Sequence, residues 1–208
     1  MTMNIICFGD SLTVGYQSPT SEVPYYHATP YGELLQAWLG EKGTVSIRGV
    51  NGEMTSEMVR RFSWDVLESQ PDMVIILGGT NDLGADIEPE RIFNNLVTLY
   101  DQARNALISP VAITVPSLRS AIHDDDHDFL STYIECRMEL NQWLMNFCQA
   151  SNMPCIDLFT RTSEPESHLL ASKYSNDGLH LSSQGYQMLA QLLWDHLWAK
   201  QYRKSRQT

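Results

Sequence analysis

Three short segments carry side chains that could do chemistry, and they lie far apart in the chain. Ser11 directly follows an apolar run, in the sequence F-G-D-S-L, and Asn81 follows a second apolar run in G-T-N-D. Asp177 and His180 lie three positions apart near residue 180. A serine hydroxyl is a poor nucleophile until an imidazole takes its proton and a carboxylate orients that imidazole. Ser11, His180 and Asp177 therefore supply the residue types that acyl transfer requires.

Acyl transfer also needs hydrogen-bond donors for the negative charge that develops on the carbonyl oxygen. The sequence offers the backbone N–H of Ser11, the backbone N–H of Gly52 and the side-chain amide of Asn81. Glycine has no Cβ to block a close substrate, and an asparagine amide donates at any working pH. We predict that these three groups form an oxyanion hole.

Each of these residues also has an ordinary structural interpretation. Asp10 or Ser11 could simply cap a helix, and Asn81 and Asp177 are common turn residues. His180 by itself would more often be a surface or core histidine. Because all these residues occur at predicted strand ends or in loops, their coincidence favours the catalytic interpretation.

Five apolar segments alternate with helical patterns, which predicts one parallel, three-layer α/β domain over residues 1–208. We expect strands at residues 5–8, 44–48, 73–77, 111–115 and 154–158. Apolar residues at helical spacing predict helices over 31–39, from about 55 to 66, 89–107, 129–147 and 183–197, with Thr55 or Ser56 capping the second. Ligands bind beyond the carboxyl ends of strands in such sheets, so the candidate residues should converge there.

Composition narrows the classes of partner. The net charge of −11 disfavours nucleic acid and anionic membranes, and no apolar run is long enough to span a membrane. No signal peptide is visible, and the four cysteines form no C-x-x-C pair, so we expect a cytoplasmic protein with reduced thiols. A phosphate-binding loop is also disfavoured, because Tyr16 stands where the motif after Gly15 requires lysine.

Some features allow two interpretations. The segment from His123 to Asp128 has metal-ligating residue types, but a solvated acidic loop is the favoured interpretation. Leu118 and Ile122 are candidates for the acyl side of a pocket. Several aromatic residues could line an acyl or sugar pocket or could simply pack beside the first helix: Tyr16, Tyr25, Tyr26, His27 and Tyr31. A basic tail from about residue 199 is expected to be frayed.

The chain resembles the SGNH hydrolases, also called GDSL lipases and esterases, over about residues 4–198. The family's first block is similar to residues 8–12, its third to 79–82 and its fifth to 177–180, while Gly52, or less well Gly49, matches the second. The nucleophile of the α/β-hydrolases lies in the motif G-x-S-x-G, whereas Ser11 lies in G-D-S-L. The resemblance implies a flavodoxin-like sheet of order 2-1-3-4-5 and hydrolysis of esters or thioesters without a cofactor.

The expected protein is therefore a serine esterase or acylhydrolase that acts on a small-molecule ester, either a lipid, an aryl ester or a thioester. Its predicted catalytic residues are Ser11, Asp177 and His180, and its oxyanion hole is formed by Ser11, Gly52 and Asn81. A carbohydrate O-deacetylase with the same residues is the main alternative, and a non-catalytic binding module is a further one. The sequence does not indicate the oligomeric state.

Overall fold

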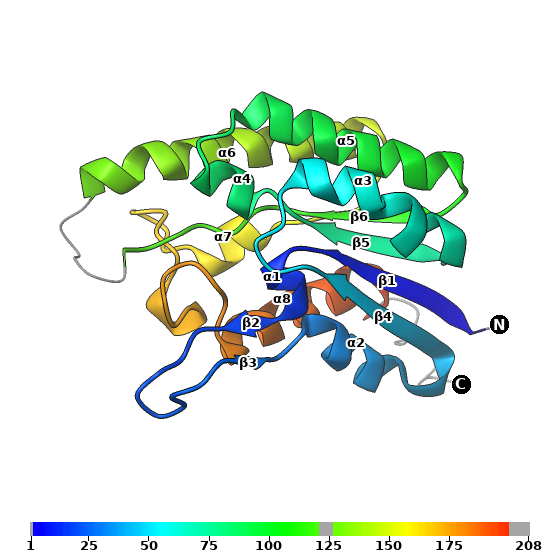
Figure 1. Cartoon of the computed structure of the whole chain (residues 1–208), viewed down its shortest axis with the longest axis horizontal. Helices are drawn as coiled ribbons and strands as arrows, with labels where there is room; N and C mark the ends of the chain where they lie inside the picture. Colours follow the sequence, from blue (N-terminus) through cyan, green and yellow to red (C-terminus); the bar gives the residue numbers. More distant parts are fainter. Residues whose placement is uncertain (1, 121–126, 200–208) are drawn as a thin grey trace.

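A five-stranded parallel sheet forms the centre of the molecule (Figure 1). The computed structural model describes residues 2–120 and 127–199, without the side chains of 127–129. The strand order is β4-β1-β5-β6-β7, which confirms the predicted order 2-1-3-4-5. The strands are β1 (Met3–Gly9), β4 (Gly43–Gly49), β5 (Met73–Leu77), β6 (Ser109–Ile113) and β7 (Cys155–Ile156).

Helices cover both faces of this sheet, as Figure 1 shows. One face carries α2 (Tyr31–Leu39) and α8 (Ser183–Leu197), and the other carries α3 (Thr55–Asp65), α5 (Pro89–Asn105) and α6 (His127–Ala150). The short elements are α1 (Ser11–Val14), α4 (Thr80–Gly84), α7 (Leu158–Thr162) and the 3₁₀ turns η1 (Gly40–Lys42), η2 (Leu67–Ser69) and η3 (Ser172–Tyr174). The predicted three-layer α/β architecture is thereby confirmed.

Apolar side chains fill the space between the sheet and each helix layer. Strand residues alternate between the two layers, because Ile5 and Cys7 pack toward α2 and α8 whereas Ile6 and Phe8 pack toward α3 and α5. Both faces of β1 are therefore buried, which explains its uninterrupted apolar sequence.

β1 and β4 are slightly longer than predicted, and the bounds of β6 and β7 differ from those predicted for reasons that side-chain contacts show. β6 begins two residues earlier than expected because Ser109 pairs with Met73 of β5, and it ends two residues earlier because the side chain of Asn141 bonds to the backbone of Val115. Asn141 Oδ1 accepts the Val115 N–H at 2.7 Å, and its Nδ2 donates to the Val115 carbonyl at 2.8 Å. β7 has only two residues, since Asp157 caps α7 by accepting the N–H of Thr160 at 3.0 Å.

The predicted cap of α3 is also wrong. α3 begins at Thr55 itself, so neither Thr55 nor Ser56 stands at the capping position. The N–H of Thr55 instead donates to the carboxylate of Asp82, which belongs to α4, the short helix after β5. A contact between distant segments thus replaces the local cap.

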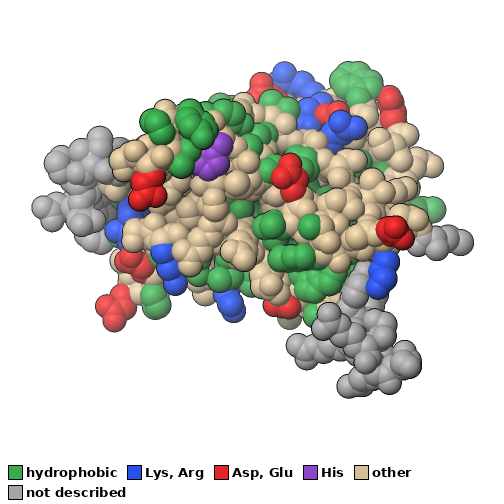
Figure 2. Space-filling view, turned by 90° about the horizontal axis from the view of Figure 1, so that it is seen from below, with side chains coloured by type: hydrophobic (Ala, Val, Ile, Leu, Met, Phe, Trp, Pro, Cys, Tyr) green, Lys and Arg blue, Asp and Glu red, His purple; other side chains and the backbone are tan. Residues whose placement is uncertain are grey.

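A small hairpin that the sequence pattern does not reveal protrudes below the sheet (Figure 1). β2 (Tyr16–Gln17) pairs antiparallel with β3 (His27–Ala28). Two-residue strands are too short to show an alternating pattern, which explains why this segment is expected only to be a loop. Figure 2 shows hydrophobic side chains gathered around a histidine at the left end of the lower face, the end at which the hairpin lies.

Several predictions concern residues outside the described part. Residues 122–126 and the tail from residue 200 lie there, while the backbone of His127 and Asp128 belongs to the start of α6; one domain over 1–208 stays a prediction. Within the described part, no helix is both long and apolar enough to cross a bilayer, and no three metal-ligating side chains come together. The four cysteines are unpaired, as predicted.

Candidate active site

The pairing of the three central strands brings distant residues to one edge of the sheet. Gly9, at the end of β1, is in register with Gly49 of β4 and with Leu77 of β5. Ser11, Gly52 and Asn81 follow these three strand ends within a few residues, so they meet at the carboxyl edge, as expected for a parallel sheet.

A continuous chain of hydrogen bonds joins the first and last of the candidate segments. The Oγ of Ser11 lies 3.1 Å from Nε2 of His180, and Nδ1 of His180 lies 2.8 Å from Oδ2 of Asp177. When Nδ1–H donates to the carboxylate, Nε2 is left to accept the serine proton. The structure therefore brings Ser11 together with His180, 169 positions later in the sequence, and with Asp177.

Five hydrogen bonds hold the Asp177 carboxylate in place, of which the longest, at 3.4 Å, runs from the Ser175 hydroxyl to Oδ1. Its Oδ1 accepts the N–H groups of Leu179 at 2.9 Å and His180 at 2.7 Å, and its Oδ2 accepts the hydroxyl of Ser18 at 2.5 Å in addition to the imidazole. Burial alone would raise the pKa of this carboxyl, but the hydrogen bonds from His180, Ser18 and the backbone outweigh it. The pKa of Asp177 consequently lies below its ordinary value.

The loop that carries Asp177 and His180 is fastened to the segment after β6. The Arg119 N–H donates to the Gly178 carbonyl at 2.8 Å. Gly178 has φ +83°, and a Cβ there would come within 2.0 Å of the Arg119 carbonyl oxygen, so only glycine fits. The Arg119 guanidinium pairs with Glu164 and donates to the Leu170 carbonyl at 2.8 Å. Nothing in the sequence pattern links these segments.

The β2–β3 hairpin packs against the same loop from the other side. The Tyr16 ring lies 4.4 Å from the His180 ring, and the Tyr16 carbonyl accepts the Tyr186 hydroxyl at 2.8 Å. Tyr25 and Tyr26 are exposed on the hairpin, whereas Tyr31 is fully buried in the core. Of the two interpretations left open for these aromatic residues, packing beside the helix is the one that holds for Tyr31.

The predicted oxyanion donors have free N–H groups. Among the described residues, no protein group accepts the backbone N–H of Ser11 or of Gly52. Gly52 has φ +75°, a conformation that favours glycine. Asn81 lies in α4 and donates one hydrogen of Nδ2 to the Glu53 carbonyl at 2.9 Å. An amide nitrogen carries two hydrogens, so a second one is left for a ligand.

A buried carboxylate that the sequence analysis did not single out connects the Gly52 and Asn81 segments. Asp82, only 2% exposed, accepts the Thr55 N–H at 2.9 Å and the Thr55 hydroxyl at 2.6 Å. The hydroxyl of Thr55 in turn accepts Nδ2 of Asn95 at 3.0 Å. The position of Asp82 directly after Asn81 in G-T-N-D is the signal that could have revealed it.

A second brace lies beneath the Gly52 segment. Arg61 donates from Nε to Glu53 Oε1 at 2.6 Å and from Nη2 to the Gly9 carbonyl at 3.0 Å. Its guanidinium also lies 4.1 Å from the centre of the Phe8 ring. Arg61 therefore ties the end of β1 to the residue whose carbonyl holds Asn81. Neither Glu53 nor Arg61 was predicted from the sequence to belong to the site.

Asp10 is fully buried beside the serine. Its Oδ1 accepts the Leu12 N–H at 2.9 Å, which confirms the capping interpretation, but its Oδ2 has no partner among the described residues. Burial raises the pKa of Asp10 to about 7, because the charged form is poorly solvated there. Since α1 has only four residues, its dipole has little effect on Ser11 at its N-terminus.

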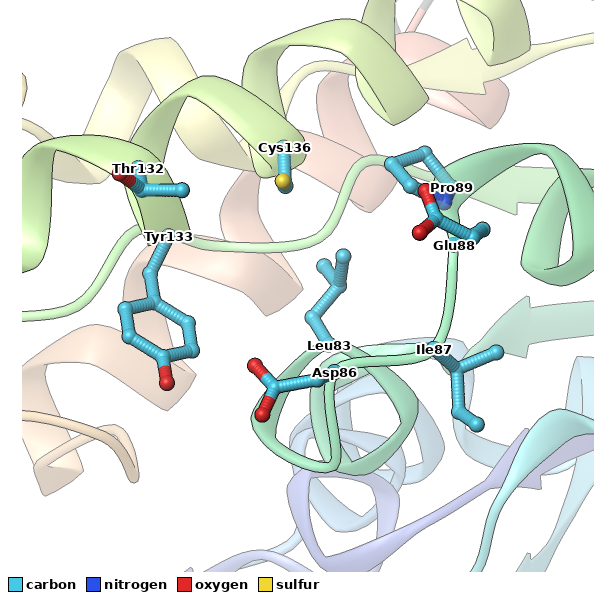
Figure 3. A pocket seen from close by; sticks show the side chains of 8 residues that line it. All are labelled: Leu83, Asp86, Ile87, Glu88, Pro89, Thr132, Tyr133 and Cys136. Carbon is cyan, nitrogen blue, oxygen red and sulfur yellow. The ribbon is translucent and has the colours of Figure 1, made fainter.

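A separate pocket of about 450 Å³ opens between the α4–α5 connection and α6 (Figure 3). Tyr133 and Cys136 point from α6 toward Leu83 and Asp86 across it. None of the residues in the Ser11–His180–Asp177 chain lines this pocket. The hydrogen-bonded chain, rather than this hollow, therefore identifies the candidate site.

Comparison with known proteins places the chain in a family. The model of the GDSL-like Lipase/Acylhydrolase family matches residues 7–188, so the chain belongs to this family. That class of protein hydrolyses ester bonds, which supports the prediction of an ester hydrolase. The resemblance inferred from the sequence blocks is confirmed.

Solved structures agree with this assignment. A GDSL-like lipase from Bacteroides thetaiotaomicron, 18% identical, has a TM-score of 0.74 over 92% of this chain and 86% of its own, which shows the shared fold. A lipase/acylhydrolase from Enterococcus faecalis is 27% identical, with a TM-score of 0.69 over 92% of this chain and 93% of its own.

A curated relative matches only in part. The lipoprotein YqeF of Bacillus subtilis (strain 168) is 29% identical over 119 residues, which cover 53% of this chain and 47% of that protein. The match thus spans about half the length of the relative. Because this relative is described as a lipoprotein, it gives no support to a cytoplasmic location, which stays a prediction.

Proposed function

We propose that this protein is a serine esterase or acylhydrolase that works through an acyl-enzyme on Ser11. The observation that carries the proposal is the hydrogen-bonded chain from Ser11 Oγ through His180 to Asp177, with contacts of 3.1 and 2.8 Å. These distances are within the range over which a general base takes a proton from a nucleophile.

The first half-reaction forms the acyl-enzyme. Ser11 Oγ attacks the ester carbonyl carbon while His180 Nε2 takes the hydroxyl proton. Asp177 stabilises the imidazolium and keeps Nδ1–H directed at its own carboxylate. The tetrahedral intermediate collapses when the C–O bond breaks and His180 returns the proton to the leaving alcohol.

The oxyanion of that intermediate accepts the N–H groups of Ser11 and Gly52 and the second N–H of Asn81 Nδ2. The two backbone groups have no other acceptor among the described residues, so they need not give up a bond when charge develops. Donors fixed in advance in this way stabilise a transition state more than a solvated ground state.

Water completes the cycle. His180 removes a proton from a water molecule, the resulting hydroxyl attacks the acyl carbon, and Ser11 Oγ leaves with the proton that His180 returns. The carboxylic acid is released. The residues named above are sufficient for this sequence of steps, and independence from a cofactor stays a prediction.

The same chemistry serves a lipid, aryl or thioester substrate and also a carbohydrate O-deacetylase, since all react at an acyl carbonyl. These alternatives differ in the leaving group rather than in Ser11, Asp177 or His180. A non-catalytic binding module is the alternative from another class, and it predicts no reactive serine at all.

Covalent labelling with a fluorophosphonate tests the proposal. The intact protein should gain the mass of one phosphonyl group, and peptide mapping should place it on Ser11. Ser11→Ala should remain unlabelled and inactive toward p-nitrophenyl acetate, while Ser21→Ala, at an exposed hairpin serine, should react like the wild type. An unlabelled wild-type protein, or a label on another residue, would contradict the mechanism.

A further inference from the structure

Two stacked tyrosines extend from the imidazole of His180 to the surface of the protein. The Tyr16 ring lies 4.4 Å from the His180 ring, and the Tyr26 ring stacks on Tyr16 at 4.9 Å with 28° between the planes. Tyr26 is 48% exposed and Tyr16 is half-buried. Aromatic faces that stay exposed beside a reactive side chain are more typical of a binding surface than of core packing.

The proposed mechanism determines which part of a substrate meets these rings. The leaving oxygen must receive its proton from His180 Nε2, so it must come within about 3 Å of that atom. The group bonded to this oxygen then lies beside the imidazole. Because the Tyr16 ring lies tilted against the imidazole and Tyr26 stacks on Tyr16, we infer that the alcohol part of the ester faces the two tyrosines.

The character of this surface indicates the kind of alcohol. It is a single aromatic face on an open hairpin, and the loop beside it is polar, with Ser21 and Glu22 exposed. A long alkyl chain would leave much of its apolar surface in water here. A pyranose ring can pack the C–H groups of one face on a tyrosine while its hydroxyls stay solvated or bond to the loop.

We propose that Tyr16 and Tyr26 form a stacking platform for a sugar ring, and that the enzyme cleaves acyl esters of sugar hydroxyls. This inference rests on the proposed function and adds the substrate class. Figure 2 is consistent with it, because exposed hydrophobic side chains gather at the end of the molecule where the hairpin lies.

The test compares three acetates that share an acyl group and differ in the alcohol: an acetylated methyl xyloside, p-nitrophenyl acetate and ethyl acetate. Tyr26→Ala should lower kcat/KM for the xyloside acetate about tenfold more than for ethyl acetate, mainly through KM, because one ring stack is lost. Tyr26→Phe keeps the ring and should restore most of the difference.

Tyr25→Ala is the matched control. Tyr25 neighbours Tyr26 and is more exposed, at 66%, but its ring stacks on neither Tyr16 nor His180. This variant should treat the three esters as the wild type does. If Tyr25→Ala lowered kcat/KM for the xyloside acetate as selectively as Tyr26→Ala does, the sugar would bind to the loop in general. That result would overturn the proposed stacking platform.

The other outcomes are equally decisive. An equal loss for all three esters would make Tyr26 a support of His180 and overturn the platform. A selective loss for p-nitrophenyl acetate alone would identify an aryl site and overturn the assignment to sugars. In these cases wild-type hydrolysis of ethyl acetate remains, whereas failure of the proposed function would leave Ser11 unlabelled and all three esters uncleaved.

Discussion

The acid–base half of the candidate site and the oxyanion half are held in place in different ways. On the acid–base side, the side chains of His180 and Asp177 are 19% and 24% exposed. Their supports are the Ser18 hydroxyl on a hairpin and the Arg119 N–H after β6. Every one of these contacts joins one loop to another.

On the oxyanion side the supports are buried carboxylates. Asp82, 2% exposed, holds the start of α3, and Glu53, 6% exposed, is paired with Arg61. Their partners are backbone groups and the guanidinium beneath β1 and β4. Removing one of these carboxylates would leave buried donors without an acceptor, which is costly.

This difference follows from what each half must do. An oxyanion hole consists largely of backbone N–H groups, which can be positioned only by fixing the chain around them. In the proposed mechanism the acid–base half instead passes a proton between side chains, which requires their correct alignment more than rigid surroundings. We therefore expect substitutions on the oxyanion side to lower both stability and activity. Substitutions on the acid–base side should lower activity far more than stability.

The largest effect should come from Asp177→Asn on the acid–base side. An asparagine can present its NH₂ to Nδ1 and so favour the wrong tautomer of His180, which should lower kcat about 10⁴-fold. The melting temperature should fall less than in a variant of Asp82, because the Asp177 side chain is 24% exposed and that of Asp82 is buried. The measurements are kcat for p-nitrophenyl acetate and thermal unfolding, with Asp101→Asn on the exposed side of α5 as control.

If Asp177→Asn lost as much stability as Asp82→Ala, the proposed difference between the two halves would be wrong. A kcat within tenfold of the wild type would instead exclude Asp177 as the group that orients His180.

Asn81→Ala should have the next largest effect. Loss of one oxyanion donor lowers kcat about 10²–10³-fold, with little change in KM because the ground-state carbonyl is bound weakly. Steady-state kinetics with p-nitrophenyl acetate measures this. Asn94→Ala, on α5, serves as the control for loss of an asparagine. An unchanged kcat would remove Asn81 from the mechanism.

Asp82→Ala tests whether the oxyanion half couples stability to activity. The variant leaves the Thr55 N–H and hydroxyl without their acceptor and should lower the free energy of unfolding by about 2–4 kcal/mol. We expect kcat to fall about tenfold as well, since the loop with Gly52 loses its anchor. Urea unfolding and kinetics measure the two effects, with Asp101→Ala as control.

A normal stability in Asp82→Ala together with a low kcat would show that this half is no more rigid than the other. Loss of stability with normal kcat would show that the Gly52 N–H is positioned by other contacts.

The sequence allowed the reactive groups to be predicted better than their supports. Ser11 and Asn81 directly follow strongly apolar strands, so the parallel fold alone predicts where they meet. The contact between Ser18 and Asp177 joins loops 159 positions apart, and no periodicity or local motif encodes such a pairing. Glu53 and Arg61 were missed for a similar reason, since their ion pair depends on how a loop folds back over α3.

The ends of the strands illustrate the same limit. β5 was predicted with its observed bounds because its five residues form an unbroken apolar run. β6 was shifted because Asn141, on a distant helix, replaces the strand partners of Val115. Contacts from elsewhere in the chain, rather than local propensity, determined where that strand ends.

Ser18→Ala should have the smallest effect and probes the acid–base half. It removes one hydrogen bond to the Asp177 carboxylate, and bonds to charged groups contribute about 1.5–3 kcal/mol, so kcat should fall about tenfold. The melting temperature at neutral pH should fall modestly, because the stability contributed by the lowered pKa of Asp177 is fully present there. Ser18→Thr keeps a hydroxyl and should recover most of the activity.

The pH dependence separates this role from a general loosening of the hairpin. Because the pKa of Asp177 is lowered in the fold, the free energy it contributes is present above its ordinary value of 3.8 and is lost as the pH falls. Without the Ser18 hydroxyl the pKa of Asp177 rises toward that value, so the acid-side loss of stability and activity should begin at higher pH. An acid limb identical to that of the wild type, with kcat uniformly lower, would mean that Ser18 positions the loop without acting on the carboxylate.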